Sequence, residues 1–175
     1  MIDPKKAAEN AAEREEENMR FRTFLLEHAD EEELDKQFLA LHHELFAWYD
    51  CCQCNNCCHG YVIALEEDEI EAIAAAHGVS KQEFARQYLV YTIEGYCVKA
   101  TDKRCCFLKE DGKCAIQGYK PAECTEFPFT HRPKRLSNML GMVKFAKECP
   151  ILIEILERLK TIYGFEANGS SEPIV

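Results

Sequence analysis

Apolar residues recur at helical spacing in two long stretches of the chain. In the first stretch the residues that share one face are Leu34, Phe38, Leu41, Leu45 and Trp48. This spacing predicts an amphipathic helix over residues 31–49, and Asp30 with Glu33 resembles a capping box at its start. In the second stretch the shared face carries Ile151, Ile155, Leu159 and Ile162. It predicts a helix over residues 148–163, which Gly164 ends.

The segments before and between these two helices carry weaker patterns. Asp3-Pro4 is a helix start, and the residues to Leu26 are rich in Ala, Glu and Arg, although the first half is polar and is expected to project into solvent. Helices are also predicted over residues 66–77, ended by Gly78, and over 81–90, opened by a capping box of Ser80 with Glu83. Short strands are predicted over 61–65, 96–100 and 113–116, with a turn at 111–112.

The rest of residues 99–147 is loop-like, with prolines at 121, 128 and 133. A loop-rich middle of this length needs something that holds it, and a bound metal would supply that stability. The pattern therefore predicts a mainly α protein with short β-hairpin elements, a small loop-rich domain organised around a cysteine-ligated metal centre. The expected parts are an acidic helical extension (1–49), the cysteine-cluster domain (50–164) and a loose C-terminal tail (165–175).

Cysteine content sharpens this picture. The 175 residues include 11 cysteines, and five of them fall within residues 51–60, CCQCNNCCHG. An odd number cannot pair completely within one chain, and the N-terminal residues do not resemble a signal peptide. We therefore expect a cytoplasmic location, where clustered thiols bind metal more often than they form disulfides. No run of 18 apolar residues is present, so no membrane partner is expected.

Charge is unevenly distributed along the chain. The net charge is −10; residues 1–72 hold 19 acids and 6 bases, whereas residues 99–147 hold 11 bases and 5 acids. The overall acidity argues against a nucleic-acid binder. The acidic N-terminal helices could instead contact a protein partner.

The spacing of the thiols bears on the kind of metal centre. Cys51, Cys54 and Cys57 form C-x2-C-x2-C, and Cys149 precedes a proline, which together match the bacterial ferredoxin run. A second C-x2-C knuckle, usual for zinc, is absent. The spacing favours a [4Fe–4S] cluster held by three of the four thiols at 51, 54, 57 and 58 with one downstream thiol, and leaves zinc as the alternative. Because Cys57 and Cys58 would point apart in an extended chain, they are expected to serve different centres.

The downstream cysteines fall in short motifs: CCFL at 105–108, DGKCAI at 111–116, KPAEC at 120–124 and FP at 127–128. With C-x2-C-x2-C-C at 51–58, they resemble the CxxCxxCC zinc- or iron-chelating family (YkgJ-type cysteine-cluster proteins). The resemblance implies eight metal ligands: Cys51, Cys54, Cys57, Cys58, Cys105, Cys114, Cys124 and Cys149. This chain has Gln117, Lys120 and Thr125 where the family usually has Tyr, Arg and Arg. Cys52, Cys97 and Cys106 lie outside the pattern and are expected to be packing or incidental thiols.

The function expected from these features is metal or iron–sulfur binding in redox chemistry, metal handling or sensing. One alternative is a structural zinc protein that binds a partner. Another is an accessory subunit or domain of a protein-modifying enzyme, since flagellin lysine methylases share a similar cysteine motif. No catalytic residue is assigned, and no phosphate-binding glycine motif is present.

Overall fold

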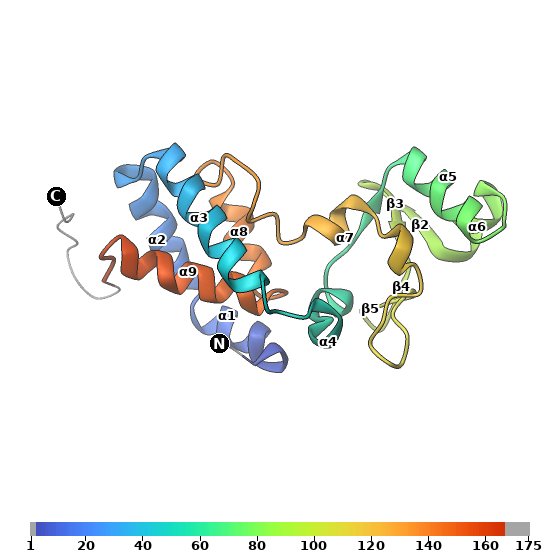
Figure 1. Cartoon of the computed structure of the whole chain (residues 1–175), viewed down its shortest axis with the longest axis horizontal. Coiled ribbons are helices and arrows are strands. Elements are labelled where there is room, and N and C mark those ends of the chain that lie inside the picture. Colours follow the sequence, from blue (N-terminus) through green and yellow to red (C-terminus); the bar gives the residue numbers. More distant parts are fainter. Residues whose placement is uncertain (1–2, 167–175) are drawn as a thin grey trace. The chain divides into compact units, whose positions relative to one another are not determined.

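The computed structural model describes residues 3–166, which form two compact units. Unit 1 combines the residues up to Asp50 with those from Pro128 onward, and unit 2 is the segment Cys51–Phe127 between them. The chain is mainly helical and has short antiparallel hairpins, which confirms the predicted secondary-structure class (Figure 1). Within the described residues no helix is both long and apolar enough to cross a membrane.

Unit 1 is built from helices alone. Its elements are η1 (Pro4–Lys6), α1 (Ala7–Glu13), α2 (Glu15–His28), α3 (Glu31–Phe46), α8 (Met139–Phe145) and α9 (Pro150–Ile162). Helix α2 packs against α8, and α3 packs against α9. The side chains that are almost completely buried here include Phe21, Leu25, Leu34, Phe38, Leu45, Met139, Ile151 and Leu152. Segments from the two ends of the sequence thus share one hydrophobic core.

The helix boundaries follow the capping residues. The Asp30 side chain accepts a hydrogen bond from the Glu33 backbone N–H at 3.0 Å, as predicted for the start of α3. This helix ends at Phe46, and Trp48 lies beyond its end with 58% of its surface exposed. The helix predicted over residues 31–49 therefore ends at Phe46, and Trp48 lies outside it.

The polar N-terminal segment differs from its prediction. Ala7 and Ala11 of α1 are buried, with 0% and 6% exposure, and α1 packs against α2 and α9. The segment therefore does not project into solvent. Alanine is small enough to let two helices approach closely, so a helix with few large apolar residues can still pack.

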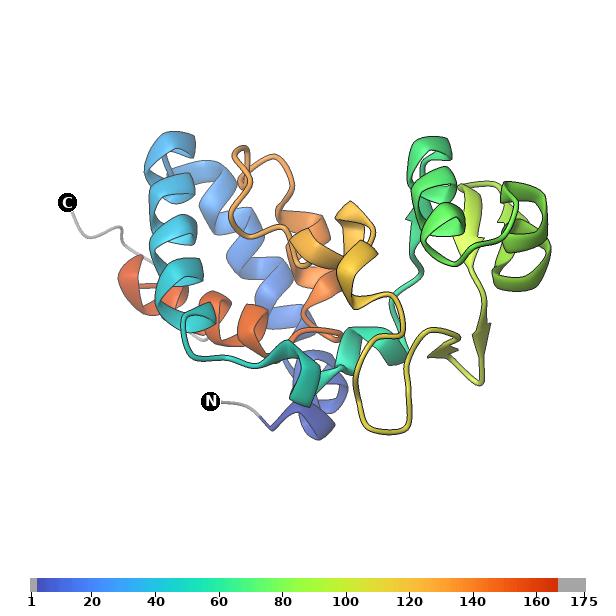
Figure 2. The same cartoon turned by 45° about the vertical axis from the view of Figure 1, so that its right-hand side comes forward.

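Unit 2 holds a small sheet with two helices and several short elements. These elements are α4 (Cys51–Cys54), η2 (Asn56–His59), β1 (Ala64–Leu65), α5 (Glu67–Ala76), α6 (Lys81–Tyr88), β2 (Leu89–Thr92), β3 (Gly95–Val98), β4 (Ala100–Thr101), β5 (Arg104–Cys105), η3 (Gln117–Tyr119) and α7 (Ala122–Glu126). Strands β1, β3 and β2 lie side by side in that order and are antiparallel. Figure 2 shows α5 and α6, in green, close to the sheet, and the yellow loop that follows β5.

The hydrophobic core of unit 2 lies beneath these helices. It is formed by Ile63, Leu65, Ile70, Ile73, Ala74, Phe84, Leu89, Val98, Phe107 and Ile116. The capping box of α6 is present, since the Ser80 hydroxyl accepts the Glu83 backbone N–H at 3.2 Å. Gly78 follows α5 with φ +70°, a left-handed conformation that glycine adopts without a Cβ clash. Both boundary predictions are confirmed.

Some short elements differ from the predictions. Residues 113–116 form no strand; within them only Cys114 makes a bridge, to Leu108. Strand β2 begins at Leu89, where the sequence predicted the end of a helix. Helices α7 and α8 lie in the segment predicted as loop. Such short elements are set by their neighbours in the fold, because local propensity is weak over four to seven residues.

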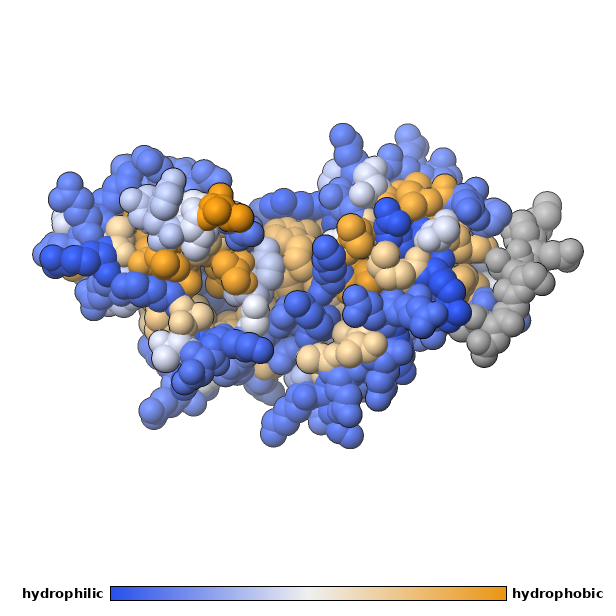
Figure 3. All heavy atoms as spheres, turned by 180° about the vertical axis from the view of Figure 1, so that it is seen from behind, coloured by the Kyte–Doolittle hydropathy of each residue, from blue (hydrophilic) through white to orange (hydrophobic). Residues whose placement is uncertain are grey.

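The face seen from behind in Figure 3 is mostly hydrophilic, with several apolar patches. The exposed large apolar residues of unit 2 are Val62, Val90, Tyr91, Ile93, Tyr96 and Tyr119. Four of these belong to the hairpin of β2 and β3 or to its turn. The rings of Tyr91 and Tyr96 pack edge to face there, with centroids 5.1 Å apart.

Candidate metal centre

The C-x2-C-x2-C-C motif is folded into two tight helical turns. Cys51–Cys54 form α4, and residues 56–59 form the 3-10 helix η2. Between them Asn55 adopts a left-handed conformation with φ 39°, which asparagine tolerates better than most residues. The Asn55 N–H donates to the Cys51 carbonyl at 2.8 Å, and the Cys58 N–H donates to the Asn55 carbonyl at 3.0 Å. The backbone of the motif is therefore hydrogen-bonded.

The neighbouring thiols Cys57 and Cys58 lie in this helical turn. Their side chains are hydrogen-bonded to each other, and this bond is the main reason that the pKa of Cys58 is lowered. The prediction that the two thiols point apart assumed an extended chain, and it is wrong because η2 is helical. Helical turns bring successive side chains to the same side more readily than a strand does.

Cys105 is held in a small β-hairpin. Ala100 and Cys105 are partners in the pairing of β4 with β5, and η2 packs against β5. A hydrogen bond with Cys106, together with the N–H groups of Phe107 and Leu108, lowers the pKa of Cys105 to about 6. Cys105 is therefore the thiol that ionises more readily than Cys106, Cys114 or Cys124. The thiolate is the form of cysteine that binds metal.

Cys114 and Cys124 lie in less polar surroundings. Both pack against the core of unit 2, as Cys105 does. Burial raises the pKa of Cys114, and burial raises that of Cys124 to about 12. The charges of Cys58 and Cys105 raise both values further, whereas Lys120 lowers them. These thiols would become thiolates only if a cation offset the charge.

Two carboxylates fix the helix that carries Cys124. The Glu69 side chain accepts the Ala122 N–H at 2.7 Å, at the first residue of α7. The Glu123 side chain accepts the Ala64 N–H at 2.9 Å. These bonds connect α7 to the start of α5 and to β1. Sequence patterns do not predict these two hydrogen bonds, because their partners lie 53 and 59 residues apart along the chain.

The eight sequence-predicted ligands divide between the two units. Seven of them lie in unit 2, and Cys149 lies in unit 1. Among the seven, Cys58, Cys105, Cys114 and Cys124 influence one another electrostatically. Cys149 is 8% exposed and precedes α9, whose first residue is Pro150.

The three other cysteines have distinct environments. Cys97 of β3 is 1% exposed and lies 3.3 Å from the Thr92 hydroxyl, as expected for a packing residue. The Cys52 thiol lies 4.0 Å from the Gln117 amide oxygen. Cys106 is exposed, and its hydrogen bond with Cys105 raises its pKa. None of the eleven cysteines forms a disulfide.

The fit of these residues to a metal depends on chemistry and on geometry. Within residues 3–166, no group of three or more His, Cys, Asp or Glu side chains has the arrangement that holds a metal ion. The donor set itself fits, because four thiols lie near enough for the charge of one to act on the next, beside the cation Lys120.

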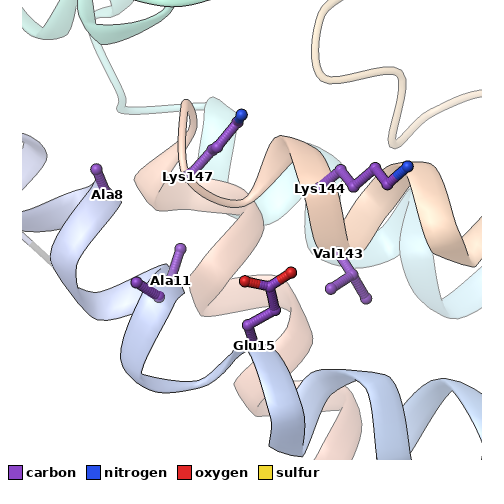
Figure 4. Close-up of a pocket in the computed structure, with 7 residues that line it drawn as sticks. Ala8, Ala11, Glu15, Val143, Lys144 and Lys147 are labelled. Carbon is purple, nitrogen blue, oxygen red and sulfur yellow. The ribbon is translucent and has the colours of Figure 1, made fainter.

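A cavity in unit 1 offers no comparable set of ligands. It measures about 380 Å³ and is lined by residues of α1, α2, α8 and the turn after α8, namely Ala8, Ala11, Ala12, Glu15, Val143, Lys144 and Lys147 (Figure 4). Glu15 is the one carboxylate there, and no thiol lines the cavity. This cavity therefore offers one carboxylate and no thiol as metal ligands.

A cysteine-rich metal-binding domain is the class of protein that these thiols define. The family described as "Putative zinc- or iron-chelating domain", CxxCxxCC, matches residues 50–150, more than half of the chain. The chain belongs to this family, which confirms the resemblance seen in its motifs. No curated protein and no solved structure was found to match the chain.

Proposed function

We propose that the protein binds metal through a four-thiolate centre in unit 2, formed by Cys58, Cys105, Cys114 and Cys124. The observation that carries the proposal is their placement: Cys105, Cys114 and Cys124 pack against the core of unit 2, and η2, which carries Cys58, packs against β5. In agreement with this placement, the charge of Cys58 and Cys105 acts on both Cys114 and Cys124. Without a cation it is unfavourable for all four thiols to ionise, because the negative charge of one thiolate raises the pKa of the next thiol. A bound metal removes that cost.

The four thiols come from four separate segments. Cys58 belongs to η2, Cys105 to β5, Cys114 follows the turn at Gly112, and Cys124 belongs to α7. A four-coordinate centre would therefore cross-link four segments of unit 2. Few helix or strand contacts hold these segments together otherwise. This set takes one thiol from the C-x2-C-x2-C-C motif and three from the downstream segments. The cysteine spacing instead favoured three thiols from that motif and one downstream thiol.

Each side chain would contribute differently. Cys105, with its pKa of about 6, supplies a thiolate at neutral pH, and the hydrogen bond with Cys57 lowers the pKa of Cys58. Cys114 and Cys124 would lose their protons on binding, and Lys120 partly offsets the negative charge that accumulates. The bound group would supply a tetrahedral cross-link if it is zinc, or one-electron redox chemistry if it is an iron–sulfur cluster.

The identity of the metal follows from analysis of the purified protein. The ferredoxin-like spacing of Cys51, Cys54 and Cys57 favours a [4Fe–4S] cluster, although the ligand set proposed here takes only Cys58 from that segment. A cluster would give iron with acid-labile sulfide, and visible absorbance, in protein prepared without oxygen. Stoichiometric zinc without sulfide would identify the zinc alternative. A protein that retains neither metal after reconstitution would contradict metal binding altogether.

The ligand set is tested by serine substitutions. Cys58→Ser, Cys105→Ser, Cys114→Ser and Cys124→Ser should each lose most of the bound metal, because serine does not replace a thiolate ligand. Cys97→Ser is the matched control, since its thiol is buried in the sheet and lies outside the set. Full metal content in all four variants would overturn the assignment.

A further inference from the structure

A small pocket with basic lining lies beside the segments that carry Cys58 and Cys105. It measures about 280 Å³, and its lining includes Asn55, His59, Arg104, Leu108, Lys109 and Glu110. Two permanent cations and a histidine thus meet one carboxylate in a protein whose net charge is −10. A local excess of positive charge against that background indicates a site for an anion.

Arg104 is fixed in a way that suits this role. Its Nη2 donates to the Leu108 carbonyl at 3.0 Å, which holds the guanidinium against the hairpin. This is the one hydrogen bond that the side chain makes to another described residue, so its other N–H groups remain available. A planar guanidinium with several donors matches the oxygen pairs of carboxylate and phosphate groups.

Two further donors line the same pocket. The Asn55 amide donates to the Cys52 carbonyl at 3.4 Å, which orients it and leaves its second N–H. Lys109 is exposed, and no ion pair of the described residues occupies its ammonium group. The loop that contains Gly112 lies close to Asn55, since a Cβ at Gly112 would lie 3.1 Å from the Asn55 amide nitrogen. Side-chain hydrogen bonds to backbone carbonyls thus hold Asn55 and Arg104 in the walls of the pocket.

We propose that this pocket binds a small oxyanion, with Arg104 and Lys109 as the principal ligands and Asn55 and His59 as additional donors. The volume lies at the small end for ligand pockets, which favours a compact carboxylate or phosphate compound over a nucleotide. The inference goes beyond the metal centre. None of the lining residues is a proposed metal ligand, although His59 follows Cys58 and Arg104 precedes Cys105.

Calorimetric titration of the purified full chain tests the proposal. The probes are inorganic phosphate and succinate, each at constant ionic strength in chloride, so that general screening is held fixed. We expect saturable binding of one stoichiometric anion. The probe that binds more tightly distinguishes a phosphate site from a carboxylate site. Absence of saturable binding for both probes would overturn the proposal.

Charge-removing variants locate the site. Arg104→Gln and Lys109→Gln should each weaken binding about tenfold, the loss expected for one charge-assisted hydrogen bond. Lys103→Gln is the matched control, because it removes the same charge from an exposed neighbour that does not line the pocket. If Lys103→Gln weakens binding as much as the other two, the effect is a general one of charge and the site is refuted.

Folding and metal content separate the possible failures. Arg104 also holds the Leu108 carbonyl, so its variant could disturb the hairpin, whereas the Lys109 side chain makes no such bond. Circular dichroism and metal analysis of every sample identify a disturbed fold or a lost metal. Normal Lys109→Gln protein with unchanged metal and unchanged anion affinity would exclude Lys109 and refute the ligand pair.

Discussion

The Asp35 carboxylate accepts a 2.7 Å hydrogen bond from the backbone N–H of Arg135, a residue 100 positions further along the chain. Its second oxygen accepts the Lys134 N–H, also at 2.7 Å. Arg135 in turn is 4% exposed, and its guanidinium donates to the carbonyls of Phe129 and Pro133. One acid of the N-terminal helices therefore organises the loop before α8.

Replacing this acid should destabilise unit 1. Asp35→Ala leaves two backbone N–H groups without their acceptor, and we expect the free energy of unfolding to fall by about 1–3 kcal/mol. Chemical denaturation followed by circular dichroism measures it. Glu32→Ala is the control, since Glu32 is an exposed acid on the same helix. Equal stability of the two variants would show that the Asp35 bonds contribute nothing.

Gly112 is expected to control the packing beside the cysteine motif. Its φ is +81°, and a Cβ there would lie 3.1 Å from the Cys52 carbonyl oxygen. Gly112→Ala should cost about 1–2 kcal/mol through the left-handed backbone alone, and should reduce metal content as well. Gly118→Ala serves for comparison, because a Cβ at Gly118 meets nothing within 4 Å. Thermal melts and metal analysis of both variants check this.

His42 should make unit 1 sensitive to mild acid. Its Nδ1 lies 2.9 Å from the Thr130 hydroxyl, and its ring contacts those of His131 and His43. Burial first, and then the charges of His131 and His43, lower the pKa of His42. Because the unfolded chain binds the proton more readily, stability is complete above the unfolded pKa of about 6.5 and falls as the pH drops below it.

Melting temperatures between pH 7.5 and 5 measure this dependence. In His42→Gln the loss of stability at low pH should be smaller than in the unsubstituted protein. His28→Gln is the comparison, since it removes a histidine of α2 outside this group. An identical pH profile for His42→Gln and the unsubstituted protein would contradict the assignment.

Metal removal should act on the two units differently. Unit 2 has short elements and carries the proposed centre, whereas unit 1 has a helical core of its own. Chelation should therefore expose protease sites within residues 51–127 while most of the helical circular dichroism persists. Mass spectrometry of the fragments gives the positions of cleavage. A melting curve and a digest that do not change on demetallation would refute this dependence.

The sequence by itself determined the long helices, several of their caps and the family. Leu34, Phe38, Leu41 and Leu45 repeat at the helical period, and the hydrogen bonds of Asp30 and Ser80 form within three residues, so nothing distant is needed to predict them. The thiol motifs were equally visible, because their order along the chain defines the family. These features are local, and local patterns can be found in one sequence.

Tertiary structure alone decided which distant residues meet. The burial of Ala7 and Ala11 depends on α9, and the position of Cys124 depends on the carboxylates of Glu69 and Glu123. Cys57 and Cys58 lie together in a helical turn, and not in the extended chain from which their directions were predicted. Such contacts join residues that are far apart in sequence, or follow from turns too short for propensity to fix, so the spacing of residue types carries no signal for them.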